Sequence, residues 1–563
     1  RKERQGQELA LTTMIVALIV IFSLLPMARL LQEVILPGGS LSVDVIYKGL
    51  VSNTTWVATW NTIAVGLGGT LFALILGVAV AILVSITDVR QRQAFVLCFV
   101  TPLMIAPQVT ALAWLQLFGP SSPLLNMLGI APPLGTRNPL YSPEGIVFLL
   151  GIQYAPLVFL IVRAGMRKLP RELVEAAQSS GAGWARVLFT IILPLMTPSI
   201  VGAAALTFVS CVGNFGIPAF LGIPANYLVL PTLIYQRLAG GGPAVLSEVA
   251  FLSVLIGIIA MIGIVLQDRL SSRRDFRITS TSLSVTPYEL GRWRVPMEIG
   301  MWVLIAIILV LPLVGLVLTS LVRGYGVTLS ADTATLENYR FVIFEHVAAR
   351  RAFLNSMYLS AAAAVFAVFV AIPLGYVIAW SKNRWIKMLN LAVELPYALP
   401  GVVLAIASLL LFLKPMPITG IQIYNTVWII LYAYLARFLV LAVRPTVTGY
   451  FQLDRALEEA AQVAGAGLFT RLRTIIFPLI APAAMAGGLL IFMTALCELT
   501  VSALLWSSGS ETIGVVIFSF EQGGDSKYAA AVSAIMVATT FLLMLLASLF
   551  ANKLPDGVLP WRD

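Results

Sequence analysis

The chain has 563 residues, of which 59% are hydrophobic and only 11% are charged, whereas soluble domains are roughly half apolar and a quarter charged. Together with a mean hydropathy of +0.94, this composition excludes an ordinary water-soluble domain and predicts a polytopic membrane protein. The formal net charge of +10 does not indicate a nucleic-acid partner, because Lys and Arg concentrate between predicted spans on the side of the N-terminus.

Twelve apolar runs are each long enough to cross the hydrocarbon core as a helix. They lie near 9–31, 57–86, 95–119, 144–165, 190–213, 248–267, 297–322, 353–380, 388–413, 424–443, 476–506 and 529–551. The first run has a basic flank but is too long for a signal peptide, so we expect a retained span. The positive-inside rule then places both termini in the cytoplasm. The expected fold class is all-α, with about twelve transmembrane helices.

Two segments that are expected to be cytoplasmic have almost the same sequence. Residues 169–183 and 453–467 are identical at 10 of 15 positions with a constant offset of 284, and both contain Glu-Ala-Ala-Gln followed by Gly. Carboxylates favour the first turn of a helix and glycine favours its end, so each copy predicts a short polar helix closed by a glycine turn. The shared residues are Glu175, Ala176, Ala177, Gly181 and Ala182 in the first copy and Glu459, Ala460, Ala461, Gly465 and Ala466 in the second.

The duplication extends along the chain. Asn61-Thr62 matches Asn355-Ser356, and Pro102 matches Pro396, both at an offset of 294. We therefore expect two repeats of six spans, 1–280 and 281–563, with the repeated loops near 169–187 and 453–473. Six is an even number, so the repeats are parallel and both loops face the cytoplasm. The arginine-rich segment 268–294 is expected to link the repeats, and the outer loops 120–143, 214–247 and 507–528 are expected to be surfaces that a partner could dock on.

The repeated Glu-Ala-Ala helix resembles the loop that couples permease subunits of binding-protein-dependent ABC importers to their ATPase. The resemblance covers nearly the whole chain and implies a MetI-like type I importer fold, with two permease copies fused in one chain. It further implies a multi-pass protein of the bacterial inner membrane that works by alternating access. The implied partners are two copies of a cytoplasmic ATPase subunit, which bind ATP and Mg²⁺, and a periplasmic or lipid-anchored substrate-binding protein. No cofactor is expected in this chain.

Ionisable groups inside spans are costly and mark functional sites. Glu394, Glu498 and Arg437 are such groups. Glu394 lies beside Pro396 and Pro400, which predict a kink that frees backbone carbonyls. As substrate-path candidates we take Glu394, Glu498, Arg437 and Asn214. The structural alternative is that each carboxylate pairs with Arg437 or with a backbone donor and only fixes helix packing.

Other functional classes find no support in the sequence. No Gly-x-x-x-x-Gly-Lys-Ser/Thr phosphate-binding loop occurs, and no Ser/His/Asp, Cys/His or HExxH arrangement is present, so an enzyme is not predicted. Cys98, Cys211 and Cys497 lie in predicted spans without metal-site spacing and are expected to be packing residues. His346 is expected to be a solvated residue of an outer loop.

The sequence indicates the class of transporter more clearly than the substrate that it carries. Glu498-Leu499 and Asn214-Phe215-Gly216 resemble stretches of fused ferric-iron permeases, although an Asp of the second stretch is absent here. Ferric iron is therefore the favoured cargo, and phosphonates such as 2-aminoethylphosphonate, or thiamine, are alternatives within the same class. A secondary transporter driven by an ion gradient, or a channel, is the rival class, and neither explains the paired Glu-Ala-Ala-Gln helices.

Overall fold

The computed structural model describes residues 2–167, 169, 171–242, 245–272, 288–380, 384–416 and 420–549, and this part of the chain is almost entirely helical. Ten helical stretches in it are long and apolar enough to cross a membrane, which confirms the all-α membrane class. The helices that form them are α1 (Lys2–Ile19) with α2 (Leu25–Ile35), α4 (Asn53–Ile86), α8 (Pro143–Met166), α11 (Leu193–Val212), α14 (Leu246–Ser272), α15 (Arg294–Ile305) with α16 (Leu311–Ser320), α18 (Val347–Trp380), α21 (Val427–Gln452), α24 (Phe477–Leu496) and α27 (Ser526–Leu549).

The two remaining predicted spans, 95–119 and 388–413, are bent pairs rather than straight helices. Helix α5 (Arg92–Met104) meets α6 (Pro107–Phe118) at 100°, and α19 (Arg384–Ala398) meets α20 (Gly401–Phe412) at 105°. Proline begins α6 at Pro107 and precedes α20 at Pro400, where it cannot continue the hydrogen-bond ladder of the helix before it. The kink expected near Glu394 is confirmed, and an equivalent break occurs in the first half.

The first span of each half packs against the other half. Helix α2 lies between α14 of its own half and α20 of the second half, and α16 lies between α27 and α6 in the equivalent way. The Tyr432 hydroxyl donates to the Ile21 carbonyl at 2.6 Å, and the Phe22 ring stacks on Tyr432 at 5.1 Å. The halves are therefore interlocked, although the predicted boundary at 280/281 itself lies outside the described residues.

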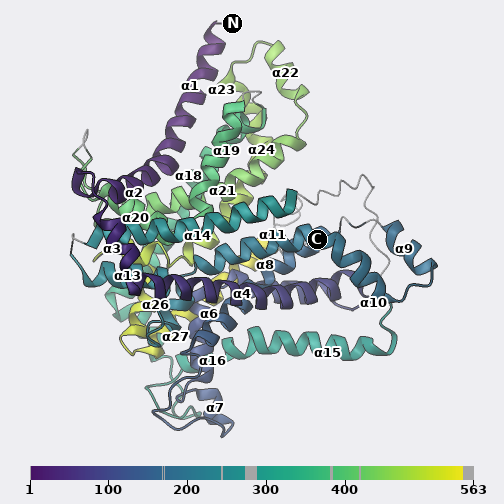
Figure 1. Ribbon diagram of the computed structural model, residues 1–563, viewed down its shortest axis with the longest axis vertical. Coiled ribbons are helices and arrows are strands. Elements are labelled where there is room, and N and C mark those ends of the chain that lie inside the picture. Colours follow the sequence, from purple (N-terminus) through teal and green to yellow (C-terminus); the bar gives the residue numbers. More distant parts are fainter. Residues whose placement is uncertain are drawn as a thin grey trace.

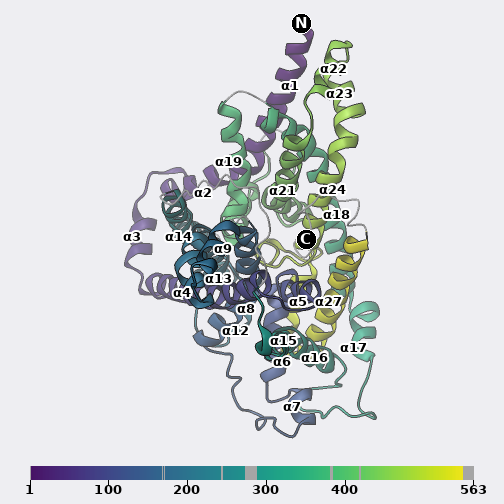
Figure 2. The same ribbon diagram turned by 90° about the vertical axis from the view of Figure 1, so that its right-hand side faces the viewer.

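The two halves point in different directions at the ends that carry the repeated loops. In Figure 1, α4, α8 and α15 run across the view while α21 and α24 rise towards the top. The two repeated loops, which contain α9 (Arg171–Ser179) and α22 (Ala456–Val463), lie at separate corners, and Figure 2 shows the same separation after a quarter turn. The N-terminal helix α1 contacts α23 (Leu468–Arg471), so the N-terminus lies on the side of these loops.

The predicted outer loops 214–247 and 507–528 are largely not surface loops. They contain α12 (Gly216–Leu221), α13 (Leu230–Gly240) and α26 (Ile513–Gln522), whose apolar residues fill the core where the halves meet. One aromatic cluster contains the rings of Phe215, Phe220, Tyr235 and Phe518. The centroids of neighbouring rings in it are 5.4–5.9 Å apart. The expectation of free docking surfaces is wrong for these helices, because burying their apolar side chains outweighs the turn-forming Gly and Pro around them.

Matched polar side chains anchor the ends of these segments, as the 294-residue offset predicts. Asn61 donates to the Leu228 carbonyl at 2.9 Å and Thr62 accepts from the Leu230 N–H at 2.8 Å. In the second half Asn355 donates to the Gly509 and Glu511 carbonyls, and Ser356 accepts from the Ile513 N–H at 2.9 Å. The two halves therefore share these hydrogen bonds as well as the matching residues.

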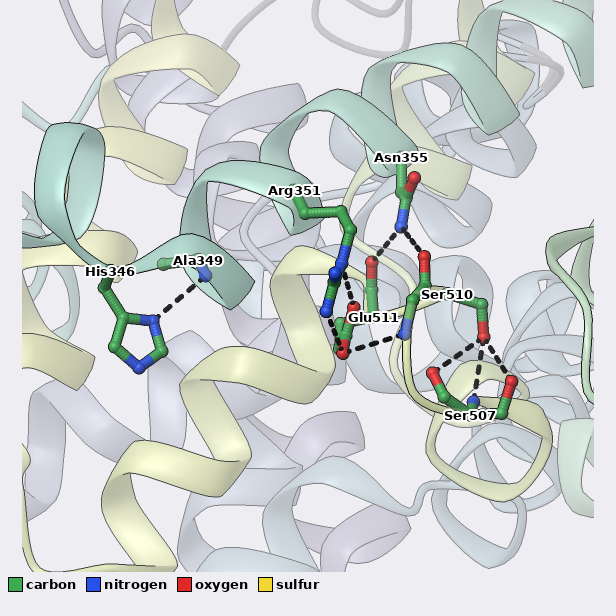
Figure 3. A network of polar contacts seen from close by, with 8 residues as sticks. His346, Ala349, Arg351, Asn355, Ser507, Ser510 and Glu511 are labelled. Carbon is green, nitrogen blue, oxygen red and sulfur yellow. Dashed lines mark hydrogen bonds and ion pairs between the residues drawn. The ribbon is translucent and has the colours of Figure 1, made fainter.

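The second half adds an ion pair at this end that the first half lacks. Figure 3 shows Arg351 bonded to both carboxylate oxygens of Glu511, each at 2.8 Å, while the Gly509 N–H also donates to Glu511. The same view shows His346, which is half-buried and whose Nδ1 accepts from the Ala349 N–H at 3.1 Å. His346 thus caps the start of α18, rather than being the solvated loop residue that the sequence suggested.

We expect the Arg351–Glu511 pair to make thermal stability depend on acid pH. Burial acts to raise the pKa of the Glu511 carboxyl, but the bonds from Arg351 and Gly509 outweigh it and hold the pKa below its usual range. The stabilisation is present above the unfolded pKa of about 4.3 and is lost as the pH falls through the lower folded value. Melting temperatures measured from about pH 6 to pH 3 should fall more steeply in the native chain than in R351Q. Parallel curves would contradict this assignment.

Candidate functional site: coupling loops and central cavity

The two repeated loops have the same backbone geometry. Gly181 follows α9 with φ +82°, and Gly465 follows α22 with φ +90°, a left-handed conformation that suits glycine. Gly181 donates to the Gln178 carbonyl at 2.9 Å and Ala182 to the Ala177 carbonyl at 3.0 Å. The bonds Gly465 to Gln462 and Ala466 to Ala461 repeat this pattern at 3.1 and 3.0 Å. This is the Schellman motif, so the repeated letters specify a helix with a defined end.

Each helix has one exposed side and one buried side. Leu173 and Leu457 occupy equivalent positions and are 47% and 49% exposed, and the adjacent Ala176 and Ala460 are exposed too. Glu459 is exposed and pairs with Arg455 at 3.4 Å, whereas Glu175 is half-buried. Exposed leucines on a short, rigid helix form a surface that another protein can bind. The structure thus presents two such surfaces, one on each half.

The buried sides of the two helices differ in chemistry. In the first half, Val174 and Val187 lie in one apolar cluster. The residues at the same offset of 284 in the second half are Glu458 and Arg471, which form a buried ion pair. The Tyr376 hydroxyl also donates to Glu458, at 3.3 Å. The first repeated loop is therefore held by apolar packing and the second by a charged pair.

The four predicted path residues surround one cavity. It has a volume of about 560 Å³, lies between the halves, and is lined by Asn214, Glu394, Arg437 and Glu498 together with both helix breaks. Tyr154, Arg444, Gln108 and Gln153 add further polar groups to its wall. The structure therefore brings together side chains that lie up to 390 residues apart in the chain. Their role in transport stays a prediction.

Asn214 and Glu498 are equivalent residues with the same structural task. The Asn214 Oδ1 accepts from the Ile217 N–H at 3.0 Å, and the Glu498 Oε1 accepts from the Val501 N–H at 2.7 Å, again at an offset of 284. Glu498 Oε2 also accepts from the Ser502 N–H at 3.1 Å. Each side chain therefore caps the short helix that follows it, α12 in the first half and α25 (Ser502–Leu505) in the second. The backbone-donor alternative fits Glu498.

The ion-pair partner of Glu394 is Arg444. The Glu394 carboxylate lies 3.6 Å from Arg444 Nε and accepts from Asn390 Nδ2 at 3.3 Å, so the pairing differs from the one with Arg437 that the structural alternative named. Arg444 lies two helical turns beyond Arg437 on α21 and therefore reaches α19 from nearer the coupling loops.

Gln153 and Arg437 occupy equivalent positions beside the two helix breaks. Gln153 donates to the carbonyls of Pro102 and Ile105 at 3.0 Å each, which satisfies groups that the α5–α6 break leaves free. Arg437 lies against Gly401 at the start of α20, and a β-carbon added to Gly401 would be only 1.5 Å from Arg437 Nη1. Gln153 and Arg444 are not among the residues predicted from the sequence. The 284-residue offset applied to Arg437 would have found Gln153.

Within the described residues, no group of three or more His, Cys, Asp or Glu side chains could hold a metal ion. Cys211 and Cys497 are enclosed in the core and half-buried, respectively, and all three cysteines are free thiols. The Cys497 carbonyl accepts from Gln108 Nε2 at 2.9 Å, which joins the two halves at the cavity wall.

Comparison with known proteins agrees with this architecture. Residues 73–280 and 371–558 each match the family described as binding-protein-dependent transport system inner membrane component. The ABC transporter permease protein y4fN of Sinorhizobium fredii is 28% identical over 96% of this chain and 95% of its own length. The ferric transport system permease protein FbpB of Actinobacillus pleuropneumoniae is 24% identical over 86% of this chain and 68% of its own.

A shorter relative matches half of the chain. The 2-aminoethylphosphonate transport system permease protein PhnV of Salmonella typhimurium is 28% identical over 45% of this chain and 92% of its own length. The family match covers more than half of the chain, occurs once in each half, and includes both coupling loops and every residue of the cavity named above. The chain therefore belongs to the binding-protein-dependent transport system inner membrane component family, as a multi-pass ABC transporter permease that carries two copies of the family's domain.

Proposed function

We propose that this chain forms the membrane-spanning pathway of an ATP-driven importer. Two copies of a cytoplasmic ATPase subunit would each bind one coupling helix, and a substrate-binding protein would deliver cargo at the opposite face. The observation that carries the proposal is the pair of Schellman-closed helices with exposed Leu173 and Leu457 at equivalent positions. One fused chain would thus provide both docking sites that a pair of identical ATPase subunits requires.

The mechanism that we propose is alternating access. ATP binding would bring the ATPase subunits together and draw the two coupling helices towards each other. Because each first span packs on the opposite half, the two halves would rotate as interlocked bodies and open the cavity towards the binding protein. ATP hydrolysis would reset them. ATP and Mg²⁺ would be bound by the ATPase subunits alone, and both termini of this chain would lie in the cytoplasm.

Ferric iron is the cargo that we propose first. The support is the similarity to ferric transport permeases over most of the chain, including both repeats. A phosphonate is the second candidate, because Arg437 lines the cavity and the guanidinium group suits phosphonate oxygens. The relative named for 2-aminoethylphosphonate transport also resembles one half of this chain.

Uptake by the reconstituted transporter tests this function. Proteoliposomes that contain this chain and its ATPase would be supplied with the binding protein and with either ⁵⁵Fe³⁺ or labelled 2-aminoethylphosphonate. We expect ATP-dependent accumulation of iron and none without ATP. Accumulation of the phosphonate alone would correct the cargo and leave the importer assignment in place. Uptake that needs an ion gradient but no ATP would refute the importer assignment.

A further inference from the structure

Arg437 is a charged side chain of the cavity wall, and one of its buried nitrogen atoms makes no hydrogen bond within the described part of the chain. It lies on α21, and among the described residues its Nη1 is buried and has no hydrogen-bond partner. Its guanidinium carbon lies 5.8 Å from the centre of the Phe438 ring. An arginine carries five N–H donors and cannot lose its proton, so an unbonded guanidinium nitrogen is costly unless an acceptor reaches it.

The carboxylates nearby are already engaged. Both oxygens of Glu498 accept backbone N–H groups of Val501 and Ser502. Glu394 is paired with Arg444 and bonded to Asn390. The charge of Glu498 attracts that of Arg437, but no hydrogen bond or ion pair joins the two side chains in the described structure. Glu498 thus offsets part of the arginine's charge and leaves its donors available.

The backbone around Arg437 also favours negative charge. Helix α20 begins at Gly401, directly against the guanidinium, and α6 begins at Pro107, which also lines the cavity. The N-terminus of a helix carries a partial positive charge and unpaired N–H groups. In the first half the equivalent residue is the neutral Gln153, whose amide nitrogen donates to the carbonyls of Pro102 and Ile105. Among the described residues of the cavity wall, Arg437 is therefore a cationic side chain with a buried nitrogen that no acceptor reaches.

We propose that Arg437 binds an oxyanion group of the cargo during its passage. A bare ferric ion would meet an unpaired cation and no free carboxylate, which disfavours it at this point of the cavity. An oxyanion fits in either of two forms: the phosphonate group of the cargo itself, or an oxygen-donor anion that stays coordinated to ferric iron. The inference rests on the proposed import function and specifies the charge of the species that crosses.

A direct measurement of anion binding tests this inference separately from the import function. The permease with its ATPase subunits, placed in nanodiscs without binding protein, would be titrated with 2-aminoethylphosphonate, inorganic phosphate and ferric citrate. We expect at least one anion to bind, and R437Q to weaken that binding by about tenfold or more, since charge-assisted bonds are the strong ones. R437K should retain part of it. R444Q is the matched control, because that arginine lines the same cavity but is already paired, and it should change the affinity less.

A second variant guards against a folding defect in R437Q. Gly401→Ala keeps the charge but places a methyl group where Nη1 now lies, so it should displace the guanidinium and weaken anion binding without changing net charge. Binding of ferric citrate alone, with ⁵⁵Fe and ¹⁴C-citrate entering proteoliposomes together, would identify the iron-bound anion as the source. Failure of all three anions to bind, or equal binding in R437Q, would overturn the proposal. Intact anion binding without any ATP-driven uptake would instead refute the import function.

Discussion

Replacing the glycine of a coupling loop by proline is expected to release the ATPase subunit while leaving the chain in the membrane. In Gly465→Pro the ring would fix φ near −65° where the loop requires +90°, and the bond to the Gln462 carbonyl would be lost. The strain of a β-carbon in a left-handed conformation is about 1–2 kcal/mol, and the lost bond adds about 1 kcal/mol. Since 1.4 kcal/mol is a factor of ten, we expect ATPase co-purification to fall roughly tenfold or more.

The double variant Gly181→Pro/Gly465→Pro should abolish binding of the ATPase altogether, because it disrupts both loops. Gly183→Ala is the matched control in the same loop: its φ is −66° and a β-carbon there meets no atom within 4 Å. That variant should keep ATPase binding and uptake. Unchanged co-purification of the ATPase in the double proline variant would remove the coupling role from both loops.

Removing Arg471 is expected to destabilise the second coupling loop strongly. In Arg471→Val the Glu458 carboxylate would stay buried without its cationic partner, which typically costs about 3–5 kcal/mol. The double variant Glu458→Val/Arg471→Val copies the Val174 and Val187 of the first half, where both side chains are buried in an apolar cluster. Because the double variant leaves no buried charge without a partner, it should recover part of the lost stability, although Val fills less space than Arg471.

The melting temperature of the purified chain and ATPase co-purification would measure both effects. Arg455→Val is the matched control, since Arg455 belongs to the same loop but forms an exposed pair with Glu459, of the kind worth less than about 1 kcal/mol. A double variant that is as unstable as Arg471→Val would show that the two loops are not interchangeable. In that case the polar base of the second loop would have a task beyond holding the helix.

The membrane class, the duplication and the end of each coupling helix could be predicted from the sequence, because each depends on local or compositional information. A hydrophobic run of sufficient length predicts a membrane span by itself. The Schellman bonds join residues at most five positions apart, so Gln178, Gly181 and their counterparts specify the turn by themselves. Prolines predicted the break near Glu394 for the same reason, because their effect on the backbone is local.

Lateral order and pairing between spans were decided only by the tertiary structure. All spans are apolar, so hydropathy does not say which helix contacts which, and it gave no sign that α2 and α16 cross to the opposite halves. Glu394 takes Arg444 rather than Arg437 as its partner, and Glu498 takes backbone donors, because those groups are the ones that helix packing brings within reach.

The internal repeat needs both the sequence and the tertiary structure to be understood. The offset of 284 residues was readable from the sequence, but the contrast between Val174 with Val187 and Glu458 with Arg471 acquired meaning only when packing showed that each pair supports a coupling helix. In the same way, Gln153 and Arg437 are equivalent by count, yet only the structure shows that the Gln153 amide nitrogen donates to two carbonyls at its helix break. The sequence by itself determined that there are two matching halves, whereas packing across 100 residues and more decided how their chemistry differs.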